Sequence, residues 1–253
     1  MNREDVGGIV ARFRASLIAN PVAAFREWYR LQEELRGGDA VLSRALADDL
    51  WELLEGDGPV ASRCSADERA RVFNGAGAFF GSPGPAANLS RSRECFRRTL
   101  LDWTRERDAD AHSRALHNLA SAIAALGATP GEISEAVSLY RRALDLRGAD
   151  REIARAATLH NLGLAFRRLA ELDPEGCRAH LAGSVAALRE ALELRRRQGL
   201  SRGDASTLFQ LGLTLRLLDD PEGIVRLREA ARALAAAGLA EQAALAAELT
   251  GES

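Results

Sequence analysis

The chain has 253 residues, of which 47% are hydrophobic and 28% charged, a composition typical of globular rather than disordered proteins. The 34 basic residues against 36 acidic ones leave a formal net charge of −2, which provides no overall basic field for nucleic acid. Aromatic residues are only 5%, and most of the apolar content is alanine and leucine. Because these two residues are strong helix formers, the composition favours an all-α protein.

The sequence shows none of the features that direct a chain to a membrane or to an oxidising compartment. Its first residues lack the basic-then-apolar order of a signal peptide. No stretch approaches the ~18 uninterrupted apolar residues of a membrane span. The three cysteines form no CxxC pair, which suits a reducing compartment. We therefore expect a cytoplasmic protein that has no membrane partner.

The first predicted region, residues 1–65, is helical and contains a possible degenerate copy of the repeat described below. A capping residue followed by proline, at Asn20–Pro21, predicts a helix start. Two apolar stripes fit the two helices of a repeat. The first stripe consists of Trp28, Leu31 and Leu35, and the second of Ala47, Trp51 and Leu54.

The second predicted region, residues 66–236, contains two segments that each recur four times. The first segment occupies residues 72–79, 116–123, 159–166 and 208–215. Its small residue falls at 76, 120, 163 and 212, so the spacings are 44, 43 and 49 residues. The second segment occupies residues 96–100, 140–144, 188–192 and 227–231. Two recurring elements in a period of ~40 residues are typical of a solenoid of helix pairs.

Helix starts and stops are marked along this region. Ser65 and Glu68 have the spacing of a capping box, which opens the first helix. Second helices are predicted to start at three pairs of a capping residue and proline, Thr129–Pro130, Asp173–Pro174 and Asp220–Pro221. The glycine- and proline-rich residues 81–85 predict a loop between helices. Residues 237–253 form the third predicted region, a capping helix over 239–249 and a tail.

The first segment resembles the tetratricopeptide (TPR) repeat: Leu159 is followed by Leu162 and Gly163, and then by Phe166. The spacing and the recurring Leu-x-Asn-Leu look most like the longer repeats of kinesin light chains. Two departures stand out, because the first tryptophan of the family is absent and alanine replaces the glycine in two copies. The resemblance implies an all-α, right-handed superhelical solenoid of antiparallel helix pairs whose concave groove binds a peptide or a partner protein.

Amide side chains lie where such a groove would be. Each helix residue advances 100°, so Asn161 lies opposite the stripe of Leu159, Leu162 and Phe166. The same arithmetic gives equivalent places to Asn74, Asn118 and Gln210. The resemblance implies that asparagine at this place bonds the backbone of an extended peptide. The alternative is an amide ladder that joins neighbouring helices and meets no ligand.

Other predicted groove residues vary along the chain, with apolar ones at the ends and polar ones between them. They are Phe73, Arg114, His117, Ser121, His160, Leu164, Arg168 and Phe209. This order suggests an elongated ligand with apolar ends and a polar or acidic middle. Equivalent histidines of adjacent repeats would lie ~8–10 Å apart, too far to share a metal ion, so we expect neither a metal nor a cofactor. Arginine pairs lie near acidic residues and are interpreted as solvated helix faces.

The sequence contains no P-loop, dinucleotide fingerprint, GxSxG or HExxH motif. The leading prediction is therefore a non-enzymatic TPR-type adaptor that binds a protein or peptide and does not bind nucleic acid. Two alternatives stay open, a peptide-sensing regulator and an accessory subunit of an enzyme complex such as a bacterial protease–TPR pair. The partner, the oligomeric state and a groove filled by the chain's own C-terminal helix are not decided by the sequence.

Overall fold

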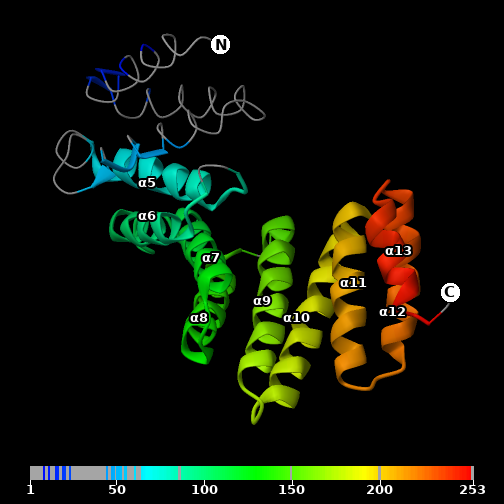
Figure 1. The fold of residues 1–253 in the computed structure, drawn as a ribbon. Helices are drawn as coiled ribbons and strands as arrows, with labels where there is room; N and C mark the ends of the chain where they lie inside the picture. The colour runs from blue at the N-terminus through cyan, green and yellow to red at the C-terminus, as the bar shows by residue number, and fades with distance from the viewer. Residues whose placement is uncertain are drawn as a thin grey trace. The chain divides into compact units, whose positions relative to one another are not determined.

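The computed structural model describes residues 64–251 except 85–86, 149 and 199–200, and sixteen individual residues between Gly8 and Val60 (Figure 1). The regular elements in the described part of the chain are all α-helices. The helices are α5 (Ala66–Gly81), α6 (Leu89–Asp102), α7 (Ala109–Leu126), α8 (Pro130–Leu146), α9 (Glu152–Leu172), α10 (Cys177–Arg197), α11 (Ser201–Leu217), α12 (Glu222–Ala236) and α13 (Ala240–Glu248). The predicted all-α class is confirmed.

The chain divides into two compact units, residues 1–126 and residues 127–253. In the first unit α5 packs on α6, and α6 packs on α7. In the second unit each helix from α8 to α13 contacts the next one along the chain (Figure 1). None of the helices in the described residues is long and apolar enough to cross a membrane.

The predicted capping residues start the helices. Ser65 accepts a hydrogen bond from the Glu68 backbone at 3.4 Å, and Glu68 accepts one from the Ser65 backbone at 3.0 Å. Thr129 and Glu132 form the same capping box at α8. Reciprocal bonds of this kind satisfy backbone donors that have no partner inside the helix.

Two other predicted starts are displaced along the chain. Asp220 accepts a hydrogen bond from the Glu222 backbone at 2.9 Å, and α12 begins at Glu222. Asp173 instead accepts from the Gly176 backbone at 3.3 Å, which closes a turn before α10 begins at Cys177. Asp173 therefore still accepts a backbone hydrogen bond, but the donor belongs to the turn rather than to the helix.

A few residues before α5 are described, and some of them make contacts. Asn20 accepts a hydrogen bond from the Ala23 backbone at 3.1 Å, as expected of a helix N-cap. Trp51 meets the ring of Phe80 edge-on at a centroid distance of 6.0 Å, and Arg98 donates to the Leu54 carbonyl at 2.7 Å. The predicted first-helix stripe of Trp28, Leu31 and Leu35 lies outside the described residues.

Three glycines allow the first helix of a pair to approach the second closely. A Cβ atom on Gly163 would lie 2.6 Å from Cγ of Leu188. On Gly77 it would lie 2.7 Å from the Phe96 ring, and on Gly212 it would lie 2.8 Å from Cγ of Leu227. Phe96, Leu188 and Leu227 open three of the four predicted second segments, so three repeats place a large side chain over a glycine.

This packing corrects the predicted alignment of the first copy by one residue. Gly77, and not Ala76, holds the place of Gly163, so the spacings of 77, 120, 163 and 212 are 43, 43 and 49 residues. Phe73 therefore corresponds to the buried Leu159, and Asn74 corresponds to His160 rather than to Asn161. The sequence alone favoured the register with Ala76 because that register aligns Asn74 with Asn118 and Asn161.

A serine hydrogen bond accompanies the close approach in two helix pairs. The Ser92 hydroxyl donates to the Gly77 carbonyl at 2.7 Å, and the Ser184 hydroxyl donates to the Gly163 carbonyl at 2.8 Å. Both serines are buried. A buried hydroxyl that makes such a bond avoids the cost of an unpaired polar group and fixes the glycine against its partner helix.

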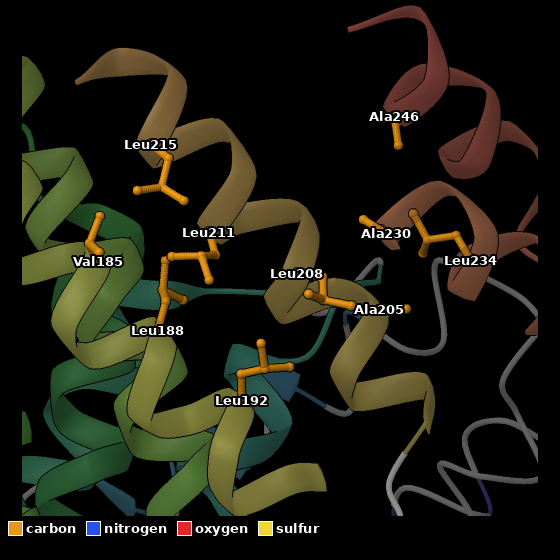
Figure 2. Close-up of a cluster of buried hydrophobic side chains, with 10 residues drawn as sticks. All are labelled: Val185, Leu188, Leu192, Ala205, Leu208, Leu211, Leu215, Ala230, Leu234 and Ala246. Carbon is orange, nitrogen blue, oxygen red and sulfur yellow. The ribbon is translucent and has the colours of Figure 1, made fainter. Parts of the chain in front are cut away.

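The core of the second unit runs through four successive helices (Figure 2). Leu188 and Leu192 of α10 face Leu208 and Leu211 of α11, and Leu234 of α12 lies beyond them. Ala246 of α13 is fully buried against the same cluster. The short C-terminal helix therefore covers apolar surface that the last helix pair would otherwise expose.

The close approach at Gly163 gives a stability prediction. Gly163→Ala should lower the free energy of unfolding by about 1–3 kcal/mol because its methyl group overpacks against Leu188. That loss should outweigh the gain of up to ~1 kcal/mol in helix propensity. Gly131→Ala is the matched control, because no atom lies within 4 Å of its added Cβ. It should be neutral or stabilising in urea unfolding, and an equally stabilising Gly163→Ala would contradict the packing account.

Candidate functional site

A cavity of about 320 Å³ lies between α5, α6 and α7 in the first unit. Small residues form two of its walls. They are Gly77, Ala78 and Gly81 of α5, and Ser121, Ala122 and Ala125 of α7. Leu89, Ser92 and Phe96 of α6 close the third side, and Ser82 and Pro83 of the α5–α6 loop lie at one end. Asn118 completes the lining, so two predicted site residues, Asn118 and Ser121, meet at one cavity.

The amide of Asn118 is held in place by Asn74. The Asn118 Nδ2 atom donates to Asn74 Oδ1 at 3.1 Å, and both residues are half-buried. Within the described part of the chain the Asn118 side chain makes no other hydrogen bond. One amide hydrogen and the Oδ1 atom of Asn118 therefore keep their capacity to bond a ligand.

The histidines make contacts of two kinds. The imidazole of His160 on α9 is bonded through Nδ1 to the Thr207 hydroxyl of α11 at 3.2 Å. Arg195 of α10 donates to the same hydroxyl. Burial, and then the charge of Arg195, lower the pKa of His160 from 6.5 to about 4. His117 is half-buried and engaged in other contacts, and its carbonyl accepts from Ser121 at 3.0 Å.

The predicted site residues of the second unit are spread over α9 and α11. Asn161 and Leu164 are half-buried, and Asn161 has an interaction partner. Gln210 is half-buried, and its Oε1 atom has no hydrogen-bond partner in the described part of the chain. Phe209 packs at the edge of the core cluster, while Arg168 is exposed and pairs with Glu171 at 2.7 Å.

Two predicted groove residues lie elsewhere. Phe73 is only 5% exposed and belongs to the core, with the Arg98 guanidinium 5.4 Å from its ring centre. Its misplacement follows from the one-residue error in the alignment. Arg114 lies with its guanidinium carbon 5.7 Å from the Trp103 ring centre, and does not line the cavity. A cation over an indole ring is a stabilising contact of its own.

Sequence reasoning missed most of the cavity lining. Ala78, Ala122 and Ala125 are unremarkable letters in an alanine-rich chain. The usable signal was their position, since small residues at helical spacing occur on two facing first helices at once. Gly77 and Gly81 also line the cavity.

A second cavity, between α10, α11 and α12, carries many charges that are already paired. Its volume is about 320 Å³, and four arginines and two glutamates line it. Arg189 pairs with Glu222 at 2.5 Å, and Arg226 pairs with Glu222 at 2.7 Å. The first pair joins the second helices α10 and α12, and the second pair lies within α12.

The cysteine and histidine side chains of the described residues bear on the requirements of a metal site and of a reactive thiol. No three His, Cys, Asp or Glu side chains there converge as metal ligands. Burial raises the pKa of the Cys95 thiol to about 12, which keeps it in its unreactive protonated form.

The lowered pKa of His160 predicts a pH dependence of stability. The unfolded chain binds a proton near pH 6.5 and the folded chain only near pH 4, so stability should fall as pH drops through this window. The loss should be of order 3 kcal/mol. Urea unfolding of the wild type and of His160→Gln across this window isolates the histidine, because the carboxylates are common to both. An equal change in the free energy of unfolding with pH in the wild type and in His160→Gln would contradict the prediction.

No family model and no curated protein matches the sequence. Solved structures do. The chain is similar to BtubC (BKLC) from P. vanneervenii, with 18% identity, coverage of 93% of this chain and 90% of that chain, and a TM-score of 0.63. It is also similar to a kinesin light chain of Podospora anserina with nearly identical TPR-like repeats, with 13% identity, coverage of 92% and 98%, and a TM-score of 0.59. At these identities the likeness shows the fold, and the chain has the fold of a TPR-like helical repeat protein.

Proposed function

We propose that the chain is a non-enzymatic TPR-type adaptor, which binds an extended segment of a partner protein along its first helices. The observation that carries this proposal is Asn118. Its amide bonds Asn74 through one hydrogen and keeps its oxygen and other hydrogen beside an open cavity. An amide donates and accepts at once, which matches the two polar groups of a peptide unit.

The bond between Asn74 and Asn118 joins the two interpretations of the amide series. It is an interhelix amide bond, as the ladder interpretation requires, because it links α5 to α7. It also fixes the rotation of the Asn118 amide, so the remaining groups are oriented before a ligand arrives. An oriented side chain loses less conformational entropy on binding, which favours affinity.

The charge and chemistry of the chain support a protein partner. The net charge of −2 provides no overall basic field of the kind that attracts proteins to nucleic acid. Stacked helix pairs present extended surfaces, which suit a peptide segment better than a small molecule. Leu164 and Phe209 in the second unit, and the cavity in the first, supply apolar surface beside the amides.

A pair of asparagine variants tests the proposal. Linear peptides are first selected on the full chain from a phage-displayed random library, and their affinities are measured by calorimetry. Asn118→Ala should weaken binding of the selected peptides roughly tenfold, since one or two hydrogen bonds to the ligand are lost. Asn74→Ala removes the same interhelix bond but leaves the Asn118 amide, so its affinity should fall less than about threefold.

The matched variant separates a ligand contact from a structural role. Equal losses of affinity in Asn118→Ala and Asn74→Ala, with equal losses of thermal stability, would assign Asn118 to the ladder alone. Selection of no peptide at all would also overturn the adaptor proposal.

A further inference from the structure

The cavity of the first unit exists because two facing helices both carry small residues. Ala78 and Gly81 line it from α5, and Ser121 and Ala125 line it from α7. Ala78 and Ala125 are themselves exposed, so each contributes a rim position rather than core packing. Small residues on one helix alone would let the facing side chains fill the space. Small residues on both facing helices leave a volume of about 320 Å³ open.

The second unit carries large residues at the same repeat positions. One repeat downstream, Leu164 stands in the place of Ser121, and Arg168 stands in the place of Ala125. In α11 the corresponding residues are Leu213 and Leu217. The open volume is therefore a property of the α5–α7 walls and not a general consequence of the repeat.

The walls of this cavity are uncharged, and most of their polar hydrogens are already used. None of its twelve lining residues is ionisable. The hydroxyls of Ser82, Ser92 and Ser121 donate to the carbonyls of Ala78, Gly77 and His117. Only Asn118 keeps a side-chain hydrogen to donate. A carboxylate or an ammonium group entering the cavity would lose hydration and meet no countercharge.

We propose that this cavity is a specificity pocket for one uncharged aliphatic side chain, of leucine, isoleucine or valine, carried by the bound segment. The proposal rests on the proposed function for the identity of the ligand as a peptide. The volume lies at the lower end of ligand pockets, which begin at roughly 300 Å³, so it suits a side chain rather than a cofactor. Leu89 and Phe96 provide apolar contact, and Asn118 at the lining bonds the peptide unit beside the side chain.

Capped single amino acids test the pocket without a selected peptide. The probes are N-acetyl-leucine methylamide and the corresponding aspartate and lysine compounds, added to the full chain carrying ¹³C-labelled alanine methyl groups. The leucine probe should shift the Ala122 and Ala125 methyl signals saturably. The charged probes should bind about tenfold more weakly or less, because they gain no burial and lose hydration.

Filling the cavity from either wall should abolish this response. Ala125→Leu and Ala78→Leu each place a larger side chain at an exposed lining position, and each should weaken the leucine probe about tenfold. The Ala122 methyl then reports binding in both variants. Ala109→Leu is the control, because Ala109 is exposed on α7 and does not line the cavity. It should bind the probe like the wild type.

The outcomes separate the pocket from the adaptor proposal. Equal binding of leucine and charged probes, no saturable shift in the wild type, or unchanged binding in both filled variants would overturn the pocket. The adaptor proposal survives those results if peptides selected on the chain depend on Asn118. Conversely, selective binding of the leucine probe without any selected peptide keeps the pocket and removes the adaptor.

Discussion

The close approach between a glycine of the first helix and a large residue of the second helix sets the geometry of three helix pairs, α5–α6, α9–α10 and α11–α12. At Gly163 the approach leaves no room for a Cβ atom beside Leu188, and Ser184 donates a hydrogen bond to the buried Gly163 carbonyl. Gly77 repeats this arrangement with Phe96 and Ser92. The contact fixes the rotation of the first helix about its axis and its position along that axis. It therefore also fixes which residues of the first helix face away from the core.

The two cavities show why charge alone does not make a binding site. Arg189 and Arg196 of α10 are already paired with Glu222 and Glu229 of α12, so an incoming anion would compete with existing ion pairs. The cavity between α5 and α7 has no such internal competitor for an apolar group. Burial of aliphatic surface there costs no broken contact, and the free groups of Asn118 are compatible with a peptide backbone.

The sequence predicted the helical class, the helix pairs and most helix starts, because capping boxes and periodic leucines are local signals. Ser65 and Thr129 cap as predicted, whereas Asp173 caps a turn instead of a helix. The site was harder to predict. Exposure of Phe73 was misjudged because a one-residue shift rotates a helix position by 100° and moves a residue from the core to the groove. The cavity was not predicted, because it depends on which small residues face one another across two helices.

In the corrected register, two adjacent positions of the first helices carry the polar side chains discussed above. The position after the buried leucine or phenylalanine holds Asn74 in α5 and His160 in α9, and each bonds the next first helix of its unit. The following position holds Asn118 in α7, whose amide keeps groups for a ligand. Asn118 therefore takes part in the link to α5 and also keeps amide groups beside the cavity. Under the proposed function, Asn74→Ala changes affinity only through the orientation of Asn118, whereas Asn118→Ala removes the proposed ligand contact.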